Sequence, residues 1–273
     1  MKKKKADARA FSTDIMRGEW AGTPTGAYDK GVANGTSIFD PVVCELAYRW
    51  FSPPGGIVLD PFAGGSVRGI VAAKLGRDYV GIDLRPEQVA ANEEQADRIC
   101  NDCAPPRWIV GDSAEIDTLL TDIEFDFIFS CPPYGDLEVY SDNPSDLSTM
   151  GHAEFMLAYR KIIAKACALL KPDRFASFVV GDFRDGRGNY QNFVSETIAA
   201  FLDAGLELYN EAILVTAVGS LPVRAGRQFD AARKLGKTHQ NVLVFLKGDA
   251  KRATAACGPV EVHLENADVE AGT

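Results

Sequence analysis

The feature that most restricts the fold is an alternation of short apolar runs with helix-like segments. Runs at 57–60 and 77–83 are each followed by a turn and a helical pattern, and further runs begin at 108, 125 and 175. Such alternation is typical of parallel strands joined by helices on the faces of a sheet. The sequence therefore predicts an α/β fold with a doubly wound, mostly parallel sheet. Two final runs, 206–216 and 241–246, have no helical pattern between them, which predicts an antiparallel last strand in a sheet of seven.

An aspartate ends each of the first three strands expected from the sequence. These are Asp60, Asp83 and Asp112, and the glycine-rich turn 61–66 follows the first of them. Carboxyl ends of parallel strands share one edge of the sheet, where open α/β sheets bind ligands. A carboxylate at Asp83 suits the two hydroxyls of a ribose, and Asp60 suits a cationic or hydroxyl-bearing ligand. The turn lacks the G-x-G-x-x-G spacing, so a dinucleotide is not the first interpretation.

The fourth strand, 125–130, is rich in phenylalanine and leads directly into Cys131-Pro132-Pro133-Tyr134. Two prolines fix φ and supply no N–H, so the chain must leave the sheet there in a stiff, extended turn. A rigid carbonyl and an aromatic face at this edge suit a planar group that carries an amine on its rim. Taken alone, the same stretch also fits a strand that simply ends in a Pro-Pro turn.

Composition limits the class of protein. The 273 residues are 46% hydrophobic and 25% charged, with no apolar run long enough to span a membrane and no apolar signal core at the N-terminus. Six scattered cysteines favour a reduced, cytoplasmic protein, and the histidines lie far from the Cys100–Cys103 pair, so no metal is predicted. The net charge of −9 argues against a general nucleic-acid coat but allows a local basic patch.

The sequence divides into an arm, a single domain and a tail. Residues 1–35 lack periodicity and are predicted to form a flexible arm, 36–248 to form the domain, and 249–273 to be a disordered acidic tail. The segment 217–237 is predicted to be irregular and is the best candidate for contact with nucleic acid. Its basic residues are Arg224, Arg227, Arg233, Lys234 and Lys237.

These motifs together resemble the S-adenosylmethionine-dependent DNA amino-methyltransferases, which methylate adenine N6 or cytosine N4. The turn Asp60-Pro61-Phe62-Ala63-Gly64-Gly65 is similar to their cofactor loop, and 131–134 is similar to their catalytic motif. The order of the motifs resembles the gamma arrangement. The resemblance spans about 36–248 and implies a Rossmann-like methyltransferase fold, S-adenosylmethionine as cofactor and DNA as partner, with a homodimer and a restriction-modification role left open. It implies as cofactor-binding residues Ser37, Phe39, Asp60, Phe62, Ala63, Gly64, Gly65, Asp83, Asp112 and Ser113.

The resemblance also implies a mechanism. The amine of a flipped base would donate hydrogen bonds to the side chain at 131 and to the Pro132 carbonyl, which would turn its lone pair toward the methyl group. Tyr134 would stack on the base, and the loop 135–150, including Tyr140, would close over it.

Cys131 stands where the family usually has Asp, Asn or Ser, and three interpretations remain. The thiol is a tolerated substitute, or the second acceptor is Ser130, Asp136 or Glu138, or Cys131 is a nucleophile for carbon-5 modification of a pyrimidine. The small, uncharged thiol is closer to Ser, which favours cytosine N4 over adenine N6. Methylation of an RNA or protein amine, and a regulatory module that binds the cofactor without turnover, are the alternative functions.

Overall fold

The computed structural model describes residues 38–135, 139–216 and 221–260, and for 221–224 it describes the backbone alone. The chain divides into two compact units, Met1–Phe39 and Asp40–Thr273, and the second unit contains all the strands described below. Within the described residues, no helix combines the length and the apolar composition that crossing a bilayer requires.

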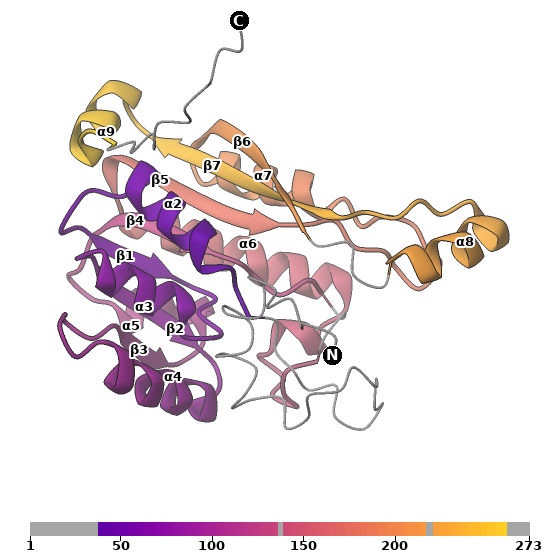
Figure 1. Cartoon of the computed structure of the whole chain (residues 1–273), viewed down its shortest axis with the longest axis horizontal. Coiled ribbons are helices and arrows are strands. Elements are labelled where there is room, and N and C mark those ends of the chain that lie inside the picture. Colours follow the sequence, from indigo (N-terminus) through magenta and orange to yellow (C-terminus); the bar gives the residue numbers. More distant parts are fainter. Residues whose placement is uncertain (1–37, 136–138, 217–220, 261–273) are drawn as a thin grey trace, which may run out of the picture. The chain divides into compact units, whose positions relative to one another are not determined.

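The second unit is built on one seven-stranded sheet with the order β3-β2-β1-β4-β5-β7-β6 (Figure 1). The first five strands of the chain run parallel to one another, whereas β7 is antiparallel to both β5 and β6. This arrangement confirms the predicted doubly wound sheet with an antiparallel last strand. The strands are β1 (Ile57–Asp60), β2 (Asp78–Asp83), β3 (Arg107–Val110), β4 (Phe125–Ser130), β5 (Leu170–Val180), β6 (Glu207–Val215) and β7 (His239–Lys247).

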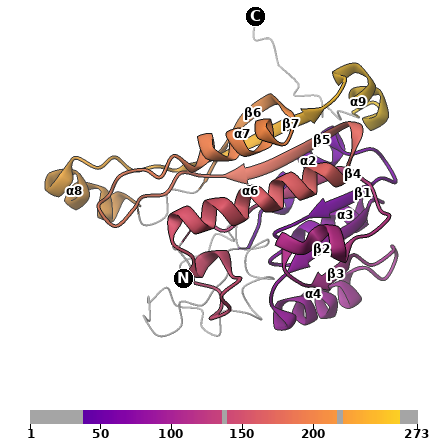
Figure 2. The ribbon, with the colours of Figure 1, turned by 180° about the vertical axis from the view of Figure 1, so that it is seen from behind.

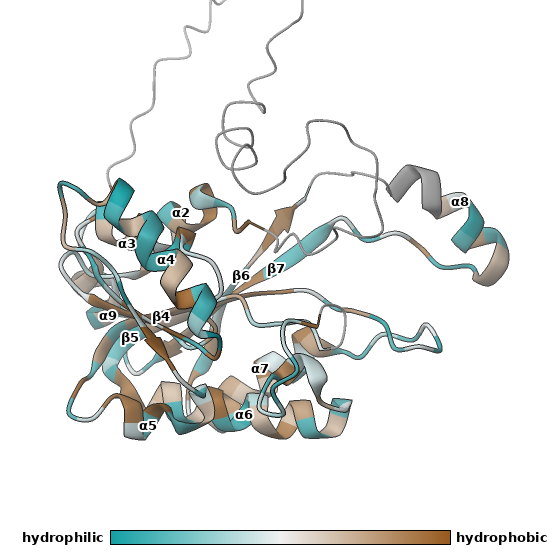
Figure 3. Cartoon of the chain, turned by 90° about the horizontal axis from the view of Figure 1, so that it is seen from below, coloured by the Kyte–Doolittle hydropathy of each residue, from teal (hydrophilic) through white to brown (hydrophobic). Residues whose placement is uncertain are grey.

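Helices cover both faces of the sheet. Figure 3 shows α2, α3 and α4 on one side and α5, α6 and α7 on the other, and α6 runs along the face formed by β4 and β5 (Figure 2). The helices are α2 (Pro41–Phe51), α3 (Val67–Lys74), α4 (Pro86–Ile99), α5 (Ile116–Leu119), α6 (His152–Leu169), α7 (Phe193–Asp203), α8 (Leu221–Ala232) and α9 (Ala250–Cys257). Two short 3₁₀ turns are η1 (Ser113–Glu115) and η2 (Leu147–Thr149).

The central strand β4 is buried along its whole length. On the α2 face, the ring of Tyr48 packs edge-on against Phe129 and Phe127, at centroid separations of 5.4 and 6.2 Å. Further along the sheet, Phe201 of α7 stacks on Phe245 of β7 at 3.9 Å. This packing fixes the strand that carries the predicted catalytic motif at its carboxyl end.

Two helices stand where the sequence predicts none. The segment 217–237 is predicted to be irregular, yet it contains α8. Residues 226–232 of this helix are all exposed, so no buried apolar stripe marks it. The tail predicted to be disordered from 249 begins with α9, which the Asp249 side chain caps by accepting from the Arg252 N–H at 2.9 Å. Ala253 and Cys257, one turn apart, bury its inner face. Residues 261–273 and the predicted arm lie outside the described residues.

Candidate active site

The predicted site residues meet at the carboxyl edge of the sheet. Asp60 and Asp83 are the last residues of the adjacent parallel strands β1 and β2, and Asp112 follows β3. Cys131 follows β4, which pairs with β1 on the other side. The structure therefore brings the three aspartates and the Cys-Pro-Pro-Tyr motif to one edge of the sheet, as the sequence predicts.

The glycine loop after β1 reaches across the end of β2. The Gly64 N–H donates to the Asp83 carboxylate at 3.0 Å, and the Gly64 carbonyl accepts from the Asn92 amide at 2.7 Å. Gly64 has a φ of +50°, a conformation that favours glycine. A Cβ added at Gly64 or at Gly65 would meet no atom within 4 Å, so the loop has an open side at both glycines.

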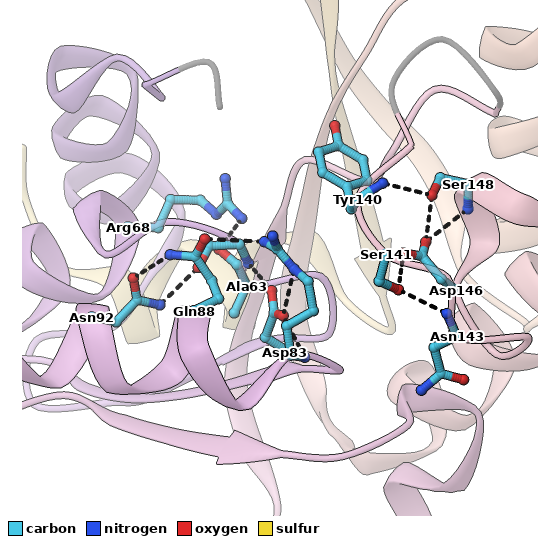
Figure 4. Close-up of polar contacts among 12 residues, drawn as sticks. Ala63, Arg68, Asp83, Gln88, Asn92, Tyr140, Ser141, Asn143, Asp146 and Ser148 are labelled. Atoms are coloured by element: carbon cyan, nitrogen blue, oxygen red, sulfur yellow. Dashed lines mark hydrogen bonds and ion pairs between the residues drawn. The ribbon is translucent and has the colours of Figure 1, made fainter. Parts of the chain in front are cut away.

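Asp83 is held by donors on two sides. One oxygen accepts from Gly64, and the other accepts from the Arg85 N–H at 2.9 Å and lies 3.6 Å from the Arg85 Nε. Burial raises the pKa of Asp83 above its ordinary value, although these hydrogen bonds oppose the shift. Arg85 in turn donates to Gln88 at 3.0 Å, and Gln88 donates to Asn92 at 2.9 Å (Figure 4). This network orients Asp83, and sequence reasoning missed its three members on the segment that follows β2.

Asp60 lies beneath the glycine loop rather than on its open side. Its side chain is 0% exposed, and its carboxylate accepts from Tyr79 at 2.7 Å, from Ser130 at 2.5 Å and from the Arg68 Nε at 2.6 Å. The expectation that Asp60 meets a cationic or hydroxyl-bearing ligand does not fit these surroundings, because protein donors surround the carboxylate. Since Ser130 directly precedes Cys131, the Asp60–Ser130 hydrogen bond links the start of the glycine loop to the predicted catalytic motif.

Arg68 of α3 is the second member of this buried pair and was missed by sequence reasoning. It is 5% exposed and donates to the carbonyls of Phe62 and Ala63 at 2.7 and 2.8 Å, as well as to Asp60. Burial lowers the pKa of Arg68, but the negative charge of Asp60 more than offsets this effect, so the guanidinium stays charged. The side chain thus fixes the start of the glycine loop from below.

The remaining predicted cofactor residues differ in their surroundings. Phe62 packs its ring against Tyr159 and Phe178, at 5.8 and 6.1 Å, so only its backbone belongs to the loop. Ser113 is buried and donates to the Pro61 carbonyl at 2.6 Å, whereas Asp112 caps η1. Ser37 lies outside the described residues and Phe39 belongs to the other compact unit, so their cofactor role stays a prediction.

The start of β7 contacts the predicted catalytic motif, residues 131–134. The Gln240 amide donates to the Tyr134 hydroxyl, and that hydroxyl lies 3.7 Å from the Cys131 sulfur. The Tyr134 ring packs edge-on against Phe193 at 6.1 Å. Burial raises the pKa of the Cys131 thiol, and the nearby charge of Arg68 opposes the shift only in part, so the thiol is protonated at neutral pH.

The structure bears on one of the three alternative acceptors for the target amine that the sequence suggests, Ser130, Asp136 and Glu138. Ser130 is fully buried and donates its hydroxyl to Asp60, which directs it into the core. Asp136 and Glu138 lie outside the described residues. Cys131 is therefore the side chain of the described motif that stands where the resemblance expects the amine acceptor.

The described part of the loop that follows the motif, residues 139–150, lies near Arg85. Asp146 organises it by accepting from Ser141 at 2.7 Å and from both the N–H and the hydroxyl of Ser148, at 2.9 and 2.7 Å (Figure 4). Tyr140 donates its N–H to Ser148 at 3.1 Å, and its ring centroid lies 5.6 Å from the Arg85 guanidinium carbon. The sequence-based interpretation placed Tyr140 over the target base, whereas the structure places it next to the residue that orients Asp83.

The basic segment projects beyond the sheet. Arg227 is exposed, and Arg233 lies 4.9 Å above the Phe229 ring. The Lys237 ammonium is 3.8 Å from Asp182. The side chain of Arg224 lies outside the described residues, so the DNA role of the segment stays a prediction. Among the described residues no group of three or more His, Cys, Asp or Glu side chains is arranged to hold a metal ion.

Comparisons with known proteins match part of the chain by sequence and most of it by fold. Residues 45–94, which include the glycine loop and Asp83, match the family model of N6/N4 methyltransferases, described as DNA methylase. The type II methyltransferase M.SmaI of Serratia marcescens is 37% identical over 59 residues, which cover 22% of this chain and 20% of that protein. The matched part therefore spans about a fifth of this curated relative.

Solved structures extend the match to the whole sheet. A methyltransferase from Pyrococcus furiosus superposes with a TM-score of 0.52 at 16% identity, covering 89% of this chain and 98% of that one. TrmN from Thermus thermophilus gives a TM-score of 0.51 at 18% identity, covering 77% and 49%. By sequence, residues 45–94 are thus similar to the N6/N4 DNA methylases, and over most of its length the chain has the fold of these solved methyltransferases.

Proposed function

We propose that the protein transfers a methyl group from S-adenosylmethionine to the exocyclic amine of a flipped DNA base, with cytosine N4 favoured over adenine N6. The observation that carries this proposal is the hydrogen bond between Asp60 and Ser130. It joins the loop that matches the DNA methylase family to the Cys131-Pro132-Pro133-Tyr134 motif, which lies outside the matched residues. Cofactor loop and catalytic motif are thereby held as one rigid unit at the ligand-binding edge of the sheet.

The residues at this edge fit the cofactor. The open side of the loop at Gly64 and Gly65 allows a ligand to approach the backbone closely. Asp83 would accept the ribose hydroxyls, for which its carboxylate is already oriented, and Asp112 would read the adenine. When bound, S-adenosylmethionine supplies an electrophilic methyl group.

The motif would hold the target amine. The lone pair of an exocyclic amine is conjugated with the base, so hydrogen bonds from its N–H groups to the Pro132 carbonyl and to Cys131 would turn the lone pair out of the ring plane. Tyr134, fixed through its hydroxyl by Gln240, would stack on the extruded base. Orientation of the amine and stabilisation by fixed dipoles, rather than a covalent intermediate, would then account for most of the rate enhancement.

The protonated Cys131 thiol supports amine methylation over carbon-5 chemistry, since attack on a pyrimidine ring requires a thiolate. Cys131→Ser should therefore keep methyl transfer within about tenfold of the wild-type rate, because the serine hydroxyl accepts hydrogen bonds at least as well as the thiol that it replaces. Transfer of labelled methyl to DNA measures this rate, and Cys103→Ser, which removes a cysteine that precedes β3, is the control. Loss of all transfer in Cys131→Ser alone would favour the covalent mechanism.

Asp83→Ala should weaken binding of S-adenosylmethionine by about 10- to 100-fold, because even one lost hydrogen bond to a charged group costs about 1.5–3 kcal/mol. Isothermal titration calorimetry measures the change. Asp117→Ala removes an exposed carboxylate that pairs with Lys165 on another part of the surface, and should leave affinity unchanged. Wild-type affinity in Asp83→Ala would remove Asp83 from the cofactor site.

The biological setting follows only from similarity. The partial match to a type II methyltransferase supports a role in restriction and modification, which we include in the proposal. A homodimer stays a prediction.

A further inference from the structure

A closed hairpin follows β5 at the same edge of the sheet. Arg184 and Tyr190 form an antiparallel bridge, and the Asp185 N–H donates to the Asn189 carbonyl at 2.9 Å. The turn is stabilised by hydrogen bonds from the N–H groups of Gly188 and Asn189 to Asp185, both at 2.8 Å. The hairpin, residues 183–191, therefore has a defined shape of its own, with Arg187 at the turn.

The base of the hairpin packs directly on the catalytic motif. A Cβ at Gly135, the residue after Tyr134, would lie 2.8 Å from the Phe183 ring, which shows how closely the two segments pack. Phe183 also packs edge-on against Phe193 at 5.4 Å, and Phe193 contacts the Tyr134 ring. The hairpin thus rises beside the proposed base pocket at a fixed position relative to Tyr134.

The hairpin and the segment after α8 share a basic surface. The Arg184 guanidinium lies 3.8 Å above the Tyr190 ring and donates to the Gly188 carbonyl at 2.8 Å, while the Arg187 side chain is 86% exposed. Lys234 lies against the turn, because a Cβ at Gly188 would collide with the end of its side chain. We call Arg184, Arg187, Lys234 and Lys237 the hairpin surface.

The acidic residues near this surface have structural roles. Asp185 builds the turn, and its carboxylate also lies 3.2 Å from the Arg187 Nε. Asp182 accepts from the Val194 N–H at 3.0 Å at the start of α7. The hairpin surface is thus a local excess of positive charge on a chain whose net charge is −9. Such an excess fits a polyanion rather than a neutral or basic partner.

We propose that the hairpin surface binds the DNA backbone next to the flipped base, with Arg187 at the turn contacting a phosphate. The proposal rests on the proposed function, because it takes the motif beside the hairpin as the pocket for a DNA base. A two-stranded ribbon has the dimensions that the major groove admits, and arginine is well suited to phosphate. The hairpin supplies Arg184 and Arg187, whereas Lys234 and Lys237 belong to the basic segment predicted from the sequence.

The test is the salt dependence of binding to a duplex of arbitrary sequence, measured with the full chain by fluorescence anisotropy. Arg187→Ala should lower the slope of log affinity against log salt by about 0.9, the value for one lost phosphate contact. Arg187→Lys should keep the wild-type slope, because it keeps the charge. Lys251→Ala, on the exposed side of α9 at the other end of β7, removes a charge elsewhere and should also leave the slope unchanged.

Each outcome is decisive. If the wild type methylates DNA but Arg187→Ala keeps the wild-type slope, the hairpin does not contact the backbone and the proposed function stands. If Arg187→Lys loses as much slope as Arg187→Ala, the contact is not a simple phosphate pairing and the proposal is wrong. A wild type that neither binds nor methylates DNA would overturn the proposed function together with this inference.

Discussion

Replacing Arg68 with methionine is expected to destabilise the fold by about 3–5 kcal/mol, because it leaves the Asp60 carboxylate buried without its counter-charge. Asp60 is 0% exposed and Arg68 is 5% exposed, so water cannot replace the lost guanidinium. The substitution also removes the donors to the Phe62 and Ala63 carbonyls. Urea unfolding measures the loss as a fall in the transition midpoint.

The control for this prediction is the double variant Asp60→Asn with Arg68→Met. A neutral amide can still accept from Ser130 and can donate to the Tyr79 hydroxyl, so the double variant should recover part of the lost stability. If Arg68→Met alone unfolds at the wild-type urea concentration, the buried ion pair does not hold the loop. If the double variant is less stable than Arg68→Met, the cost does not come from an unpaired carboxylate.

Tyr134→Ala is expected to lower kcat/KM for methyl transfer to DNA by about 100-fold, since stacking on an extruded base contributes about 1–3 kcal/mol and a misplaced base loses more. Tyr134→Phe keeps the ring but loses the hydrogen bond from Gln240, so about a fivefold loss is expected, equivalent to about 1 kcal/mol. Labelled transfer measures both variants.

The Tyr134 variants distinguish an effect on binding of the target base from an effect on binding of the cofactor. Affinity for S-adenosylmethionine, measured by calorimetry, should stay at the wild-type value in both, because the residues proposed to bind the cofactor gather around Asp83. Equal activity of Tyr134→Ala and Tyr134→Phe would show that the ring does not hold the base.

Much of the fold could be predicted because local signals mark the ends of its elements. Pro41 and Pro86 each occupy the first position of a helix, where proline is favoured, and so mark where α2 and α4 begin. The unbroken burial of β4 follows from its phenylalanines, and Pro132 ends it as expected. The common edge for the three aspartates follows from the parallel arrangement alone.

The side-chain contacts that hold the site in place could not be predicted, because they join residues from separate helices, strands and loops. Arg68 is a charged residue within an amphipathic helix, a pattern that normally indicates a solvated face, and only the position of Asp60 explains its burial. Tyr140 was expected over the base, but a loop contact with Arg85 decides its place. The described side chains of α8 form no buried stripe. The hairpin at 183–191 has the sequence of an ordinary glycine-rich turn.

The measurement that tests the central claim most directly is transfer of labelled methyl from S-adenosylmethionine to genomic DNA, followed by nucleoside mass spectrometry. Wild type and Cys131→Ser are compared side by side, with RNA and bulk protein as parallel acceptors. The account predicts label on cytosine N4 or adenine N6 from both proteins. Label on carbon 5 of cytosine that disappears in Cys131→Ser, or label that enters only RNA or protein, would contradict it.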